Sequence, residues 1–155
     1  AQPLAFQGMA ILNTGSRGAN LIAVRLDAST QGNVNETHVV WNREKGNSRL
    51  CFPVLHGERI YSLTDSGVLS CINANNGQEV WTGRIGGNFV ASPIVANDLI
   101  YLFGEDGRGT VVRAGDKFEL VARNRLNEGG KASPSIAKGA IYVRSSGHLY
   151  KLSRP

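Results

Sequence analysis

The sequence contains a repeat with a period of about forty residues, marked by prolines at positions 3, 53, 93 and 134. Eight residues after each proline stands an apolar residue of the same strand-like run: Ile11, Tyr61, Tyr101 and Tyr142. Internal repeats of this length are typical of propellers, solenoids and other arrays of one supersecondary unit. The repeat therefore limits the fold more than composition does, because every unit has to form the same local structure.

Each unit is interpreted as a series of short strands joined by tight turns. The prolines mark first strands, second strands are predicted at 9–12, 59–63, 99–103 and 140–143, third strands at 21–24, 68–72, 110–113 and 148–152, and fourth strands at 38–41, 79–81 and 118–121. Turns such as Asp65-Ser66-Gly67 separate second from third strands, because glycine supplies the positive φ of tight hairpins. No segment shows sustained helical spacing.

Four short strands in a unit of about forty residues describe one blade of a β-propeller. We therefore predict an all-β fold, a β-propeller segment of three four-stranded antiparallel blades plus a three-stranded incomplete blade, in a single domain. A β-sandwich would also give short strands, but it does not predict a proline and a terminal aromatic residue in a fixed frame. The first blade holds about ten extra residues in the polar loop 28–37, and the predicted blades are 1–47, 48–87, 88–128 and 129–155.

The segment Cys71–Trp81, CINANNGQEVW, resembles the PQQ-like repeat, whose usual form is Ala-Leu-Asp-Ala, two residues, Gly, three residues and Trp. The Ala-Ser-Pro entries of the third and fourth units are similar to the same family, and the resemblance covers nearly the whole chain. It implies that Trp81, and Trp41 in the same frame, pack between neighbouring blades. The third unit has Val121 at the Trp position, so its blade contact is expected to be weaker.

The same resemblance raises the possibility of a quinoprotein dehydrogenase, whose sites use adjacent cysteines in a disulfide, a calcium ion and an acidic base. The two cysteines, Cys51 and Cys71, are assigned to the first and third strands of one blade, about two spacings of 4.8 Å apart. This exceeds the Cα limit of about 7 Å for a disulfide, so we predict two free, buried thiols. We predict no catalytic, metal-binding or cofactor-binding residue, and no cofactor in this segment; PQQ with calcium is expected only if the chain is a fragment of a quinoprotein-type oxidoreductase. Whether the protein is an enzyme stays open, with the non-catalytic interpretation favoured.

Other features of the sequence do not form a recognisable chemical site. His38, His56 and His148 have no second His or Cys at metal-ligand spacing, and Gly104–Gly109 joins two strands, whereas a phosphate loop opens a helix. The net charge of +5 comes mostly from arginines scattered singly along the chain. Nucleic-acid binders concentrate such charge on one face, so no nucleic-acid partner is expected. No apolar stretch approaches the roughly 18 residues of a membrane span.

Topology predicts one candidate ligand face. In an antiparallel four-stranded blade, the linker to the next blade lies at the same end as the turn between the second and third strands. Loops on a rigid scaffold are where recognition residues usually lie. The predicted face therefore combines linker and turn residues: Arg49, Asp65, Asn88, Glu105, Asp106, Lys131 and Ser146.

A propeller ring of about seven or eight blades has no free sheet edges, whereas three blades and three strands leave edges exposed. We expect missing blades, which would supply the fourth strand of the last blade, or a second copy of the chain, to close the ring. The favoured function is a binding or scaffolding module for protein or polysaccharide partners, in the manner of PQQ-like proteins of the bacterial envelope. The resemblance implies a periplasmic or extracellular location.

Overall fold

The computed structural model describes residues 2–15 and 19–153, which form fifteen β-strands in four sheets and contain no helix. The first sheet contains β1 (Leu4–Phe6), β2 (Met9–Asn13), β3 (Leu21–Arg25) and β4 (Val39–Arg43), and the second β5 (Val54–His56), β6 (Arg59–Leu63), β7 (Val68–Asn73) and β8 (Glu79–Arg84). The third contains β9 (Ile94–Ala96), β10 (Leu99–Phe103), β11 (Arg108–Arg113) and β12 (Leu120–Arg125), and the fourth β13 (Ser135–Ala137), β14 (Ala140–Arg144) and β15 (Leu149–Leu152).

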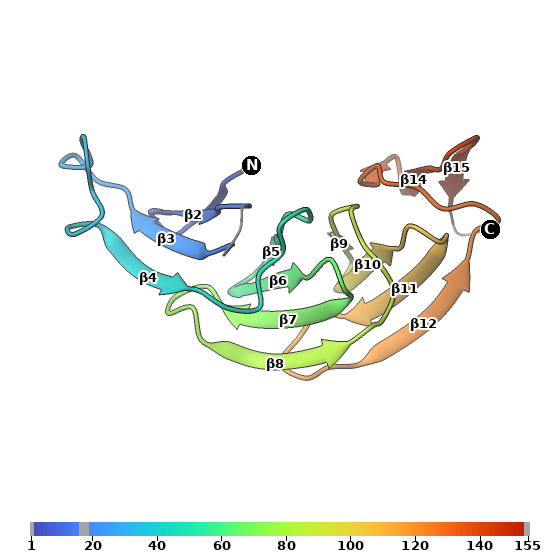
Figure 1. Ribbon diagram of the computed structural model, residues 1–155, viewed down its shortest axis with the longest axis horizontal. Helices are drawn as coiled ribbons and strands as arrows, with labels where there is room; N and C mark the ends of the chain where they lie inside the picture. Colours follow the sequence, from blue (N-terminus) through green and yellow to red (C-terminus); the bar gives the residue numbers. More distant parts are fainter. Residues whose placement is uncertain (1, 16–18, 154–155) are drawn as a thin grey trace.

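Each sheet is an antiparallel meander, in which strands that are consecutive in sequence are paired. Figure 1 shows the four sheets following one another around an arc, with β5 and β9 on its inner side and β8 and β12 on its outer side. The inner strands β5 and β9 lie against each other. This is the architecture of a β-propeller segment with three four-stranded blades and one three-stranded blade, which confirms the predicted fold class.

The second strands agree closely with the sequence pattern, but the first strands differ from it, and the fourth strand predicted at 118–121 is found at Leu120–Arg125. The second strands predicted at 59–63 and 99–103 coincide with β6 and β10. The first strands are shorter than the proline-containing runs, because each of them begins at the residue after its proline. Proline has no N–H to donate to a sheet ladder, so it stands at the start of a strand. Cys51 consequently precedes β5, and its predicted place on that strand is wrong.

The hydrophobic core lies in the seams, as we call the interfaces between successive sheets. In the first seam, residues such as Ile11 and Leu21 of the first sheet pack with Ile60 and Ile72 of the second. In the second seam, residues of the second sheet that include Leu63, Leu69 and Cys71 pack with Ile100, Leu102 and Val112 of the third. Burial of this apolar surface is the main force that holds the sheets side by side.

Two indoles cross the first and second seams. Trp41 Nε1 donates a hydrogen bond to the carbonyl oxygen of Ala74 (3.0 Å), and Trp81 Nε1 donates to that of Gly115 (2.8 Å). Each acceptor lies in the turn after the third strand of the following sheet. The Trp81 ring also lies 5.9 Å from the ring of Tyr61, whose hydroxyl accepts a hydrogen bond from Gly115 N (2.8 Å). The second seam is thus fixed both by apolar packing and by two directed hydrogen bonds.

The third seam has no indole at the equivalent position. In the second sheet Trp81 pairs with Cys71, and at the equivalent place in the third sheet Ala122 pairs with Val111. Val121 lies in a β-bulge and has no partner in the register. The tryptophan position of the third unit is therefore occupied by Ala122, and the prediction that Val121 stands there is wrong. The reason is that the chain between the paired positions is one residue longer in the third sheet than in the second. A methyl group cannot reach the neighbouring sheet as an indole does.

Serine hydroxyls link successive units at the entries to their first strands. The backbone N–H of Phe52 donates to Ser92 Oγ (2.8 Å), and the N–H of Ser92 donates to Ser133 Oγ (3.0 Å). Each bond joins residues about forty positions apart, which is one period of the repeat. The Ala-Ser-Pro entries therefore have a structural role of their own, because the serine satisfies a backbone donor of the preceding unit.

The two cysteines are free and buried, as predicted. Burial raises the pKa of both thiols to about 11, and in each case desolvation of the thiolate is the largest cause. We expect a thiol reagent such as 5,5′-dithiobis(2-nitrobenzoate) to label neither cysteine in the native protein at pH 8, because only the thiolate reacts. Both should react rapidly in denaturant. A thiol that reacts rapidly before unfolding would contradict the burial of Cys51 or Cys71.

Candidate binding face

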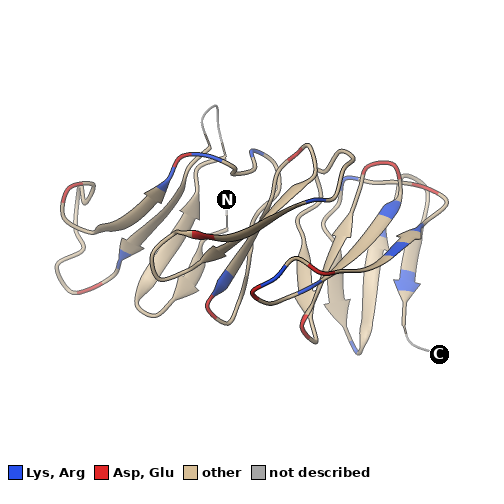
Figure 2. Cartoon of the chain, turned by 90° about the horizontal axis from the view of Figure 1, so that it is seen from below, with Lys and Arg blue, Asp and Glu red and all other residues tan. Residues whose placement is uncertain are grey.

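Linkers and turns meet at one end of the sheets. Backbone hydrogen bonds join Phe89 N to the Asp65 oxygen (2.9 Å), Glu105 N to the Asn88 oxygen (3.0 Å) and Ser146 N to the Gly129 oxygen (3.1 Å). Each of these bonds joins a linker between two sheets to the turn between the second and third strands of a sheet. Figure 2 shows the strands running between two rims of loops, with charged residues at both rims. We call the rim formed by these linkers and turns the linker–turn face; it contains all seven residues of the predicted ligand face.

At the second sheet, Asp65 is the centre of the linker–turn contact. Its carboxylate accepts hydrogen bonds from Ser48 Oγ (2.7 Å), Arg49 Nε (3.1 Å) and Leu50 N (3.2 Å). Burial alone would raise the pKa of Asp65, but the bonds from Ser48, Arg49 and Leu50 outweigh it, so the pKa lies below its ordinary value. The ionised carboxylate therefore ties the first linker to the β6–β7 turn.

At the third sheet, the predicted residues pair in two ways. Lys131 Nζ lies 3.4 Å from Glu105 Oε1 and joins the third linker to the β10–β11 turn. Asp106 instead pairs within its own turn, where it accepts hydrogen bonds from the backbone N–H (3.1 Å) and guanidinium (3.2 Å) of Arg108. Asn88 takes part through the backbone oxygen described above. These exposed pairs each contribute little stability, about 0–1 kcal/mol, and their side chains can exchange partners.

At the fourth sheet, sequence reasoning missed the central residue, which is Glu128. Its carboxylate accepts hydrogen bonds from Ser145 Oγ (2.8 Å), Gly147 N (2.8 Å) and His148 Nδ1 (2.9 Å). The Gly147 N–H is the largest cause that lowers the pKa of Glu128, followed by the Ser145 hydroxyl and His148. Here the acid comes from the linker and the donors from the turn, the reverse of the second sheet, and this reversal hides the equivalence from sequence comparison.

The low pKa of Glu128 predicts a pH-dependent contribution to stability. A carboxyl whose folded pKa is depressed stabilises the fold above its unfolded pKa, about 4.3, and that stability is lost as the pH falls through the folded value. We therefore expect Glu128→Gln to lower the melting temperature at pH 7 but to have little effect near pH 3. Thermal unfolding of both proteins across this range measures the difference. An equal deficit at both pH values would show that Glu128 acts through packing and not through its charge.

Three of the predicted residues line a shallow depression of about 290 Å³ on the linker–turn face. Glu105, Lys131 and Ser146 line it together with Arg144, Ser145, Gly129 and Gly130. The other four predicted residues, Arg49, Asp65, Asn88 and Asp106, do not line it. The depression offers a carboxylate, an ammonium, a guanidinium and two hydroxyls within one concave surface. Such a set can form hydrogen bonds and ion pairs with a polar partner.

No metal-binding cluster of three or more His, Cys, Asp or Glu side chains occurs within residues 2–15 and 19–153. The three histidines are apart: His38 lies in the first sheet's long loop and contacts Asp27 (3.4 Å), His56 contacts Asp98 (2.8 Å), and His148 contacts Glu128. The described part of the chain also contains no helix long and apolar enough to span a membrane. The groups gathered on the linker–turn face are carboxylates, hydroxyls, an ammonium and guanidinium groups, which form hydrogen bonds and ion pairs.

The fold places the protein among the β-propellers built from four-stranded repeats. In this one, a tryptophan of one sheet hydrogen-bonds to the following sheet at the first and second seams. A family model described as "Outer membrane protein assembly factor BamB" matches residues 18–150. The chain belongs to this family, which carries the PQQ-like repeat, and the resemblance noted in the sequence is confirmed. A search of curated protein sequences gives no significant match.

Solved structures with the same fold include BamB from Moraxella catarrhalis, which is 22% identical with a TM-score of 0.72 over 94% of this chain and 43% of that one. A quinohemoprotein alcohol dehydrogenase from Pseudomonas putida HK5 is 13% identical with a TM-score of 0.68, over 90% of this chain and 27% of that one. A europium-containing methanol dehydrogenase is 17% identical with a TM-score of 0.60, over 79% and 24%. The chain therefore spans less than half the length of each of these proteins. At these identities the likeness concerns the fold.

Proposed function

We propose that the chain is part of a non-catalytic β-propeller that binds a protein partner through the linker–turn face. The observation that carries this proposal is the set of polar contacts that recurs at the second, third and fourth sheets, with a concave surface beside Lys131. A rigid scaffold that holds polar side chains in successive loops is suited to recognition. Membership of a family described as an assembly factor favours a protein partner over the polysaccharide that the sequence also allowed.

Site-specific photo-crosslinking tests this proposal. A photoreactive amino acid at Lys131 or Ser146 is expected to trap a discrete protein partner in cells, because both residues lie beside the depression. Lys117 serves as the matched control, since it is exposed and lies in the β11–β12 turn at the opposite rim. The proposal fails if no partner is trapped from Lys131 or Ser146, or if Lys117 traps the same partner equally well.

The proposal includes closure of the ring and a location in the bacterial envelope. The β15 strand pairs with β14 on one side, and the other blades of the complete protein, or a second copy of this chain, would supply a fourth strand to it. In this proposal the blades are residues 1–47, 48–87, 88–128 and 129–155. Measurement of the mass of the purified protein in solution distinguishes closure within one chain from closure by two copies.

A second candidate function is a quinoprotein-type oxidoreductase, favoured by the structural likeness to two alcohol-oxidising dehydrogenases. Its cofactor, PQQ with calcium, would then be held by other blades, because the described residues form no metal cluster. Addition of PQQ and calcium to the purified protein, followed by absorbance and dye-reduction measurements, tests it. Uptake of the quinone with dye reduction would overturn the non-catalytic proposal.

A further inference from the structure

The third seam, between β9–β12 and β13–β15, is less filled than the other two. Equivalent cross-strand pairs show this: Ile60 with Ile72, and Ile100 with Val112, are 0% exposed. The corresponding residues of the fourth sheet, Ile141 and Leu152, are half-buried, and Ile136 on the adjacent strand is 44% exposed. Apolar side chains that close the first two seams are thus left accessible in the third.

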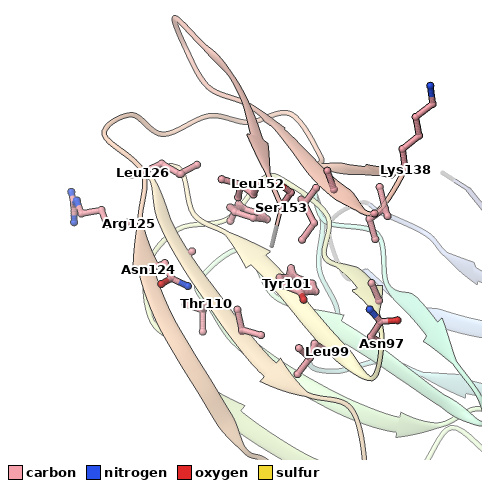
Figure 3. A pocket seen from close by; sticks show the side chains of 18 residues that line it. Asn97, Leu99, Tyr101, Thr110, Asn124, Arg125, Leu126, Lys138, Leu152 and Ser153 are labelled. Carbon is pink, nitrogen blue, oxygen red and sulfur yellow. The ribbon is translucent and has the colours of Figure 1, made fainter. Parts of the chain in front are cut away.

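A cavity of about 830 Å³ occupies this seam. Its lining includes Leu99, Tyr101 and Val111 from the third sheet, and Ile136, Ile141 and Leu152 from the fourth. Figure 3 shows Tyr101 in the middle of the lining, with Leu99 to one side and Leu152 to the other. Cavities of about 300–1,000 Å³ with mostly apolar walls and a few polar groups are typical of small-molecule sites.

The repeat indicates what shape this cavity accommodates. Tyr101 occupies the position that Tyr61 has in the second sheet, since they pair with Val111 and Cys71 in the same register. In the second seam, the indole of Trp81 lies 5.9 Å from the Tyr61 ring. Ala122, which is not itself among the lining residues, stands in place of that tryptophan. A ring attached at that position and directed as the Trp81 ring is would lie beside Tyr101.

The charged residues that line the cavity have one sign. Arg125 and Lys138 are among its lining residues, and no acidic residue is. Figure 3 shows both side chains at the margin, with their charged ends directed outwards, so they act at the entrances and not in the apolar interior. Residues 120–155 contain seven lysines and arginines and one glutamate, which adds to the positive potential of this region. The amides of Asn97 and Asn124 provide hydrogen-bonding groups in the lining.

We propose that the third seam binds a small molecule that combines an aromatic ring with a negatively charged group. The ring occupies the space beside Tyr101, where apolar walls from both sheets exclude water. The anionic group lies at an entrance, where Arg125 or Lys138 attracts it. This site is distinct from the linker–turn face, and the inference does not depend on the function proposed for that face.

Indole-3-acetate is a direct probe, because it carries the missing indole and one carboxylate. Calorimetric or NMR titration of the purified protein is expected to show saturable binding with a Kd of about 0.1–1 mM, as befits a ligand of this size. Tryptamine carries the same ring and a positive charge, and it should bind at least tenfold more weakly. Absence of saturable binding, or equal binding of both compounds, would overturn the proposal.

Two variants locate the site. Ala122→Trp places an indole in the cavity, so indole-3-acetate should bind at least tenfold more weakly while the melting temperature rises by about 2–4 °C. Arg125→Glu combined with Lys138→Glu leaves the cavity open and should weaken indole-3-acetate at least tenfold. Lys117→Glu, an exposed charge reversal away from the cavity, is the matched control and should leave the Kd unchanged.

The test remains decisive even if the Ala122→Trp variant does not fold. If Ala122→Trp lowers the melting temperature, the charge-reversal pair decides the matter alone. The proposal is wrong if the folded Ala122→Trp protein binds indole-3-acetate as tightly as the parent. It is equally wrong if the charge-reversal pair and the Lys117→Glu control have the same Kd.

Discussion

Replacement of Trp41 by alanine is expected to lower the free energy of unfolding by about 3–5 kcal/mol, the range measured for large aromatic side chains in protein cores. Trp41 is 8% exposed, packs between the first and second sheets and donates a hydrogen bond to Ala74. Gly77 of the second sheet lies so close to its indole that a Cβ there would stand 2.6 Å from a ring carbon. The substitution therefore removes apolar contacts and a hydrogen bond together. Urea unfolding, with an unchanged slope, measures the loss.

Val40 provides the control for this experiment, since it is the neighbouring residue on β4 and 39% exposed. Val40→Ala should change the free energy of unfolding by no more than about 0.5 kcal/mol, as is usual for surface substitutions. A similar cost for both variants would mean that the indole does not join the first two sheets.

Gly129→Ala is expected to cost more than about 3 kcal/mol, above the usual range for overpacking. A Cβ at Gly129 would overlap the backbone carbonyl of Glu105 and approach the backbone nitrogen of Gly107 at 2.7 Å. Both atoms belong to the β10–β11 turn, which is closed by the bond from Gly107 N to the Gly104 oxygen (3.1 Å). Neither can move aside as the end of a flexible side chain can, so the linker would have to leave the turn.

The matched control for this substitution is Gly8→Ala. Gly8 has a φ of +73° and no atom within 4 Å of an added Cβ. Alanine at this position would therefore lose free energy only because it has to adopt a left-handed backbone conformation. That loss is about 1–2 kcal/mol. Thermal or urea unfolding of both variants separates steric overlap from conformational strain. If Gly129→Ala is no worse than Gly8→Ala, the close approach of the linker to the turn is not part of the folded protein.

Most of the fold could be predicted because a repeat supplies the same information several times. The prolines, the glycine turns and the apolar runs such as 59–63 agree between units, so each first, second or third strand is supported by three equivalents and each fourth strand by two. The error at Val121 has a physical cause. The turn between β11 and β12 has one residue more than the turn between β7 and β8, and this residue shifts the frame, whereas the β-bulge recurs in both sheets. Spacing counted from a distant proline cannot detect such a shift.

The candidate face could be placed by topology but not resolved into contacts. Antiparallel connectivity puts linkers and turns at one end, whereas the choice of partner depends on how far each side chain reaches. The Asp65 carboxylate accepts hydrogen bonds from Ser48 and Arg49 of the linker, whereas the Asp106 carboxylate accepts one from Arg108 of its own turn. Glu128 could not be found from the equivalence of units, because its acid stands on the linker and not on the turn. The third-seam cavity likewise requires coordinates, since it depends on what the fourth sheet leaves uncovered.

Four hydrogen bonds between successive blades share one polarity, whereas the bond from Gly115 N to the Tyr61 hydroxyl runs the other way. Trp41 and Trp81 donate to the blade that follows, and so do the backbone amides of Phe52 and Ser92. For the four bonds of shared polarity, loss of a later blade would leave donors without partners in the blade before it, while loss of an earlier blade would leave only oxygen acceptors, which tolerate missing partners better. With respect to these bonds, detachment of a blade on the N-terminal side of an interface carries the smaller penalty.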